Sequence, residues 1–234
     1  LFGKYSEPVV KSINVIASLY YNNYDYLQAE KYYFECWNIL DSMNNDKNEA
    51  WSTLFINLGS NYYAQSDYQN AALHFEKAIQ SNKEIFEGKN VDLCFLYINL
   101  GATEEVMGLY SSSIANFQKA KDIYYELEST LSPHYLAHIY FCLGSPYQRL
   151  SEYETAIKNY QQALTTLSEL ETKEYKLIGL INKRLGDCYT GLGDLEKAKN
   201  YYTISSQQYD FLPDAIHEDK YDAEFGLART LTAK

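Results

Sequence analysis

Small and aromatic residues recur at helical spacing along most of the chain. Ala71, Phe75 and Ala78 are separated by four and then three residues, which places all three on one face of a helix. The same spacing recurs within residues 156–163. A small residue on either side of a ring lets two helices approach closely while the ring fills the gap between them. The pattern therefore predicts closely packed helices and an all-α fold.

This pattern repeats about every 42 residues. The pair Leu58-Gly59 recurs at three later places, and the intervals between successive glycines are 42, 43 and 42 residues. One period before Leu58, Ile16 and Ala17 occupy the same place. The later copies are Leu100-Gly101, Leu143-Gly144 and Leu185-Gly186. The chain is therefore expected to form a single array over residues 1–234, with five units and a partial sixth, at residues 9–43, 48–87, 90–129, 133–171, 173–210 and 213–234.

Short polar segments divide each unit into two helices. A pair such as Ser66-Asp67 separates the two helices of its unit, and Ser132 before a proline fits a helix cap. Ser151 and Glu154 match the S-x-x-E capping box. First helices are predicted at residues 9–22, 48–64, 90–107, 133–149 and 173–190. Second helices are predicted at residues 25–42, 67–86, 111–129, 152–170 and 194–209.

The recurring glycines lie inside the first helix of each predicted unit. A glycine in a helix interior costs about 1 kcal/mol relative to alanine. We therefore expect a second helix to cross at each glycine, so closely that a side chain there would not fit.

The order of large, small and aromatic positions resembles the tetratricopeptide repeat. A common unit of that family has 34 residues, and the longer unit here is similar to those of kinesin light chains and bacterial peptide-sensing regulators. The resemblance implies a right-handed superhelix, or α-solenoid, of antiparallel helix hairpins, with the first helices lining its concave surface. Because the chain begins at Leu1 and ends inside a sixth unit, we expect a fragment of a longer protein.

Composition removes several classes of function. The formal net charge of −11 would repel a nucleic-acid backbone, so no direct nucleic-acid binding is expected. No apolar run approaches the ~18 to 20 residues that a spanning helix needs, so no membrane span is expected, and the N-terminus lacks a signal peptide pattern. The four cysteines are far apart in sequence, which favours isolated thiols in the reducing cytoplasm.

The tetratricopeptide resemblance assigns a set of residues to the concave groove, at fixed places around each Leu-Gly site. Asn57 and Asn99 share the place directly before that site, and an amide can pair with a peptide backbone because it both donates and accepts hydrogen bonds. An amide that merely stabilises the hairpin is the alternative. The predicted groove residues are Asn14, Tyr21, Asn57, Tyr63, Asn99, His138, Arg149, Lys183 and Arg184.

The basic members of this set have two interpretations. Arg149, Lys183 and Arg184 could together receive a carboxylate, which arginine binds through two parallel hydrogen bonds. They could instead be solvated charges that pair with Asp187 and nearby glutamates, because surface ion pairs are common and weak. Tyr21 and Tyr63 lie outside the predicted packing positions and could stack on a ligand.

No catalytic or cofactor motif is recognised. His134 and His138 are four residues apart, but the glutamate of an H-E-x-x-H zinc motif is missing. We therefore predict no metal, no cofactor and no enzymatic activity. The leading hypothesis is an interaction module that binds a protein segment or peptide in its groove. The main alternative is the sensor portion of a bacterial regulator, in which a signalling peptide fills the same groove.

Overall fold

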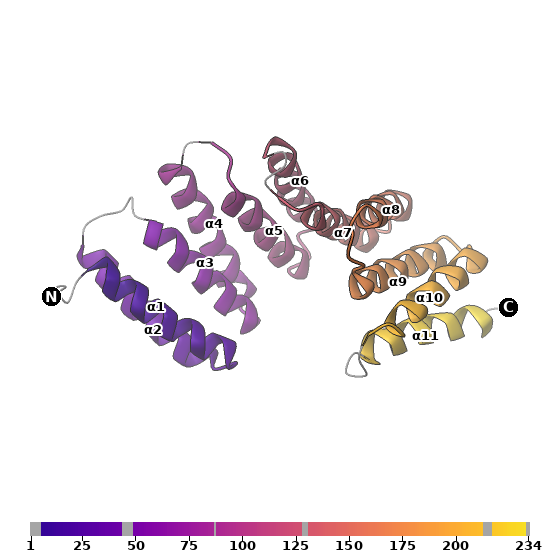
Figure 1. The fold of residues 1–234 in the computed structure, drawn as a ribbon, viewed down its shortest axis with the longest axis horizontal. Coiled ribbons are helices and arrows are strands. Elements are labelled where there is room, and N and C mark those ends of the chain that lie inside the picture. The colour runs from indigo at the N-terminus through magenta and orange to yellow at the C-terminus, as the bar shows by residue number, and fades with distance from the viewer. Residues whose placement is uncertain (1–5, 44–48, 87, 128–130, 213–216, 233–234) are drawn as a thin grey trace. The chain divides into compact units, whose positions relative to one another are not determined.

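The computed structural model describes residues 6–43, 49–86, 88–127, 131–212 and 217–232. Within these ranges the chain forms eleven α-helices and no strand (Figure 1). It divides into two compact units, which meet between Leu127 and Glu128 in the sequence. The prediction of an all-α fold built from successive helix pairs is therefore confirmed.

Unit 1 contains three helix hairpins. In each hairpin the two consecutive helices pack together, and the second helices of the first two hairpins also pack on the first helix of the hairpin that follows. The first helices of the first two hairpins contact each other directly. The six helices are α1 (Glu7–Asn22), α2 (Tyr26–Ser42), α3 (Glu49–Ala64), α4 (Tyr68–Ile85), α5 (Val91–Val106) and α6 (Tyr110–Glu126).

Unit 2 contains two further hairpins and a final helix. The final helix packs against the second helix of the preceding hairpin and also contacts its first helix. The five helices are α7 (Pro133–Arg149), α8 (Tyr153–Ser168), α9 (Tyr175–Gly191), α10 (Leu195–Tyr209) and α11 (His217–Thr232). The predicted boundaries of the ten paired helices agree with these to within three residues.

Each recurring glycine meets an aromatic ring sixteen residues later, on the second helix of its own hairpin. A Cβ atom added at Gly59 would lie 2.7 Å from the ring of Phe75, and one added at Gly101 would lie 2.9 Å from Phe117. Gly144 and Gly186 meet Tyr160 and Tyr202 in the same way. Carbon atoms normally pack 3.5–4.0 Å apart, so these sites have no room for a side chain. The close helix crossing expected from the sequence is confirmed.

The turn inside each hairpin has the same backbone geometry in all five copies. One residue adopts a positive φ at each turn, and the next amide donates a hydrogen bond back to the fifth residue before it, as from Asp67 to the Tyr62 carbonyl at 2.9 Å. This arrangement is a Schellman-type helix end. Glycine fills the positive-φ position in two turns, and other residues fill it in three; the five residues are Tyr24, Ser66, Gly108, Ser151 and Gly193.

The capping box expected at Ser151 is wrong. Ser151 has a φ of 61° and belongs to the end of α7, because the Schellman-type turn requires a left-handed residue at this place. The residue that caps α8 is Glu152, and its side chain makes no cap hydrogen bond. The cap predicted at Ser132 is confirmed, since its hydroxyl accepts a hydrogen bond of 3.3 Å from the His134 amide.

Small polar side chains tie neighbouring helices together inside both units. The Cys36 thiol donates to the Val10 carbonyl at 3.5 Å, and the Ser205 hydroxyl donates to the Gly179 carbonyl at 2.7 Å. Cys36 is fully buried, and burial raises the pKa of its thiol to about 12. Cys36 therefore packs as a small buried residue between the two helices.

No helix in the part of the chain that the structure describes combines the length and the apolar character needed to cross a membrane.

Candidate functional site

The first helices of unit 1 carry the predicted amide residues. Asn14 on α1 and Asn57 on α3 are half-buried, and the Asn57 amide donates a hydrogen bond of 2.9 Å to the Asn14 side-chain oxygen. Asn99 lies at the equivalent place on α5, and its backbone carbonyl accepts from Thr103. This bond joins the first helices of two successive hairpins, while no hydrogen bond joins the Asn99 amide to another described residue.

Two tyrosines lie near the C-terminal ends of the same helices. The Tyr21 ring lies 5.5 Å from the Tyr26 ring, and the Tyr63 ring lies 5.3 Å from the Tyr68 ring, measured between centroids. Burial raises the pKa of Tyr21, whereas Tyr63 remains 38% exposed. Each tyrosine is thus held by a partner from the start of the second helix, and Tyr63 still presents ring surface to solvent.

The remaining predicted groove residues lie in unit 2. His138 on α7 lies 3.7 Å from the Cys142 sulfur, and burial, together with the neighbouring His134, lowers its pKa. Among the described residues, no three histidine, cysteine or acidic side chains gather as metal ligands would.

The three basic residues do not share one arrangement. Lys183 on α9 lies 3.6 Å from carboxylate oxygens of both Asp187 and Asp222, so the ion-pair interpretation applies to it. Arg184 is half-buried beside it on α9, and Arg149 is exposed at the end of α7. No ion pair joins either arginine to a described residue.

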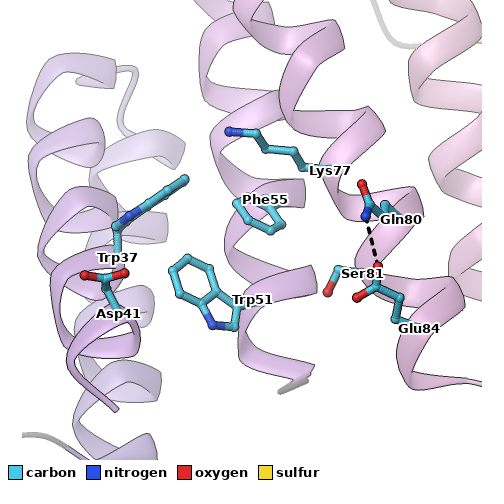
Figure 2. A pocket seen from close by; sticks show the side chains of 8 residues that line it. All are labelled: Trp37, Asp41, Trp51, Phe55, Lys77, Gln80, Ser81 and Glu84. Carbon is cyan, nitrogen blue, oxygen red and sulfur yellow. Dashed lines mark hydrogen bonds between the residues drawn. The ribbon is translucent and has the colours of Figure 1, made fainter. Parts of the chain in front are cut away.

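A pocket between the first two hairpins of unit 1 was not predicted from the sequence. Helix α3 contributes its floor, and α2 and α4 contribute its walls (Figure 2). Its volume is about 350 Å³. We call it the aromatic pocket, and its lining residues are Trp37, Asp41, Trp51, Phe55, Lys77, Gln80, Ser81 and Glu84.

Three rings form the apolar part of this pocket. Trp37 packs edge-on against Trp51 and Phe55, with centroid distances of 5.2 and 5.5 Å. Trp51 and Phe55 stack on each other at 5.5 Å. The ammonium of Lys77 lies 5.3 Å from the Trp37 ring and 5.8 Å from the Phe55 ring. These distances are within the range at which a cation is attracted to an aromatic face.

His74 lies behind the aromatic pocket, in contact with the same rings. Its ring stacks on Tyr62 at 5.4 Å and lies 6.2 Å from Trp37. Only 7% of the residue is exposed. Burial, with a smaller contribution from Lys77, lowers its pKa to about 4. His74 is therefore neutral at physiological pH and supports the rings of the pocket from behind.

One signal in the sequence could have drawn attention to this pocket. The chain has only two tryptophans, and both line the pocket. Tryptophan is enriched where one protein contacts another. The repeat alignment alone did not reveal it, because Trp37 and Trp51 fall outside the positions that recur in every unit.

Comparison with known proteins supports the repeat assignment. A family model described as tetratricopeptide repeat matches residues 47–126 and 135–208. No curated protein matches the chain.

Solved structures of low sequence identity share the fold. BtubC (BKLC) from P. vanneervenii is 18% identical, with a TM-score of 0.76 over 87% of this chain and 83% of that chain. The nearly identical TPR-like repeats assigned to a Podosopora anserina kinesin light chain are 13% identical, with a TM-score of 0.73 over 88% of this chain and 97% of that one.

A larger protein contains a similar array. A signal transduction ATPase with numerous domains from Pyrococcus horikoshii, which has a tetratricopeptide repeat sensor, is 17% identical with a TM-score of 0.73. The match covers 95% of this chain but 36% of that protein.

Proposed function

Because the chain belongs to the tetratricopeptide repeat family, whose domains bind protein partners, we propose that it binds an extended protein segment along the first helices of unit 1. The observation that carries this proposal is the series of half-buried polar side chains on those helices. Asn14, Asn57 and Asn99 present amides, and Ser18 and Ser60 present hydroxyls, on helices that follow one another in the array. Such groups match the donors and acceptors of an extended backbone.

The Asn14–Asn57 hydrogen bond orients the two amides and leaves some of their hydrogen-bonding groups unused. An amide side chain has two N–H donors and an oxygen with two lone pairs, and this bond uses one donor of Asn57 and one lone pair of Asn14. The unused groups can pair with a bound backbone. The bond therefore fixes the orientation of both amides before a ligand arrives, which reduces the entropy lost on binding.

A peptide selection followed by calorimetry tests the proposal. A peptide selected from a display library against the whole chain should bind the Asn57→Ala/Asn99→Ala variant at least about tenfold more weakly, since each lost hydrogen bond contributes ~1 kcal/mol. Asn38→Ala is the matched control, because Asn38 is exposed on the second helix α2. Equal affinity of all three proteins would contradict the assignment of this surface.

The sensor hypothesis places a signalling peptide on the same surface. It is favoured only by the resemblance to an array that serves as a sensor in the Pyrococcus horikoshii ATPase. A helix-turn-helix, kinase or ATPase domain encoded next to this array would support the sensor, and a scaffold needs no such domain. We further propose that the chain resides in the cytoplasm, where its four free cysteines would stay reduced.

A further inference from the structure

The aromatic pocket has a counterpart one repeat later in unit 1. Residues 42 positions after six of its lining residues line a second depression of about 340 Å³ between α4, α5 and α6. These six counterparts are Lys83, Leu93, Tyr97, Lys119, Asp122 and Ile123. The hairpin stack therefore builds a depression at this place in two successive repeats, and the side chains decide its chemistry.

The buried polar atoms of the aromatic pocket have no equivalent in the second depression. The Trp51 indole nitrogen and the Ser81 hydroxyl are buried and have no hydrogen-bond partner among the residues that the structure describes, and each residue is only 8% exposed. Leu93 and Ile123 occupy their places one repeat later and are also buried. The fold thus accepts two apolar residues here, so the unpaired polar atoms are not needed for packing. An unpaired buried polar group lowers stability, and a ligand that supplied the missing partner would remove this cost.

The charge of the aromatic pocket is also specific to it. Asp41 and Glu84 lie on opposite walls (Figure 2), and neither forms an ion pair with a described residue. The place of Asp41 is taken by Lys83 in the second depression, where Lys83 and Lys119 lie 5.5 and 5.0 Å from the Tyr97 ring. The aromatic pocket therefore favours a cation, and the second depression does not.

We propose that the aromatic pocket binds an arginine side chain of a partner protein. A guanidinium is planar, so it can stack on the rings while its N–H groups reach the Asp41 and Glu84 carboxylates. It would take the place over Trp37 and Phe55 where the Lys77 ammonium now lies. The backbone carbonyl beside that arginine supplies the acceptor that the Trp51 N–H lacks. The chain's net charge of −11 attracts a basic partner over longer distances.

This site is separate from the surface proposed above for an extended segment. The aromatic pocket is formed by α2, α3 and α4, and none of its residues is among those predicted for the groove. Its test consequently uses different variants from Asn57 and Asn99, and either proposal can fail without the other.

Nuclear magnetic resonance of the two tryptophan indoles gives a direct readout. The chain contains only Trp37 and Trp51, so each indole N–H signal can be assigned by replacing one tryptophan with phenylalanine. The probe is the blocked peptide acetyl-Gly-Arg-Gly-amide, added to the whole chain up to millimolar concentration. We expect saturable movement of both indole signals and weaker binding as salt is raised.

The matched probe is the same peptide with citrulline in place of arginine, which keeps the shape and removes the charge. The matched variant is Asp41→Lys, which installs the residue type found at the equivalent Lys83. Both changes should weaken the response at least about tenfold, since a charge-assisted hydrogen bond is lost. The helical circular dichroism of the variant should match that of the parent, because Asp41 is exposed.

The proposal would be overturned by indole signals that do not move with the arginine peptide, by equal movement with the citrulline peptide, or by an unchanged response in Asp41→Lys. Signals that move with protein concentration alone would identify a second copy of this chain as the occupant, and would also overturn it.

Discussion

The contact between Gly59 and Phe75 makes the packing of a hairpin testable with a single methyl group. An alanine Cβ at residue 59 would lie 2.7 Å from two atoms of the Phe75 ring, about 1 Å closer than carbon atoms normally pack. Phe75 is only 2% exposed, so its ring cannot move into solvent. Forcing extra carbon into a packed core costs about 1–3 kcal/mol, and the better helix propensity of alanine offsets about 1 kcal/mol.

Gly59→Ala should therefore lower the free energy of unfolding by about 1 kcal/mol, and Gly59→Leu by more than about 3 kcal/mol. Urea unfolding followed by far-ultraviolet circular dichroism measures both effects. Asn38→Ala is the control for helix propensity alone, and it should leave stability unchanged or slightly raised.

A double-mutant cycle ties the effect to the ring. Phe75→Leu makes room at the crossing, so the combined Gly59→Ala/Phe75→Leu variant should be more stable than the sum of the two single changes predicts, by about 1 kcal/mol. Strict additivity, or an alanine variant more stable than the parent, would refute the packing explanation. Gly144→Leu should reproduce the loss in unit 2, where Tyr160 faces the glycine.

Three further predictions follow from the turns, the buried histidine and the thiols. Ser66→Gly should raise the free energy of unfolding by about 0.5–1 kcal/mol and Gly193→Ser should lower it by a similar amount, because both positions have a positive φ that glycine adopts without strain; effects of the opposite sign in urea unfolding would contradict this. Since the pKa of His74 is lowered to about 4, its contribution to stability is complete above the unfolded pKa near 6.5 and is lost as pH falls toward 4. The difference in free energy of unfolding between the parent and His74→Phe should therefore change by about 2 kcal/mol between neutral pH and pH ~4.5. A constant difference would argue against a neutral buried imidazole. Iodoacetamide should label the half-buried Cys142 well before the other three cysteines, whose thiol pKa values are raised to about 11–12 by burial; mass spectrometry that finds uniform labelling would contradict the core described here.

The period of the sequence was enough to predict the hairpins. Glycine and aromatic residues sixteen positions apart recur in four units, and each such pair meets in the structure because the two residues lie at similar distances from the turn between their helices. A prediction from a local motif failed at Ser151. The S-x-x-E capping pattern there competes with a helix end that needs a residue in the left-handed conformation. Backbone geometry set by the turn prevailed over the short motif.

The sequence did not predict pairs of contacting residues whose residue types differ from one repeat to the next. Tyr62 stacks on His74, and at the equivalent places in the next unit the buried Glu104 accepts a hydrogen bond of 2.7 Å from Asn116. Tyr189 and Tyr201 stack at 5.3 Å. The residue types at these two places change together from unit to unit. A pattern that follows one position at a time therefore does not reveal the contact between them. The aromatic pocket was not predicted either, because its lining residues come from three different helices.

The repeat register predicts which helix carries each candidate groove residue, but not the contacts that its side chain makes. The register correctly placed Asn14, Asn57 and Asn99 on successive first helices. It could not show that Asn57 donates to Asn14 or that Lys183 also faces Asp222, because those contacts depend on how far one helix is shifted against the next. Asn57→Ala should consequently lower the free energy of unfolding by about 1 kcal/mol, whereas Asn99→Ala should leave it unchanged.

The central claim is that a partner segment binds along the first helices of unit 1. Amide chemical-shift mapping of the whole chain with a selected peptide locates the bound segment directly. We predict that the perturbed signals concentrate on α1, α3 and α5, around Asn14, Asn57 and Asn99. Perturbations confined to the second helices α2, α4 and α6, or to unit 2, would contradict the claim.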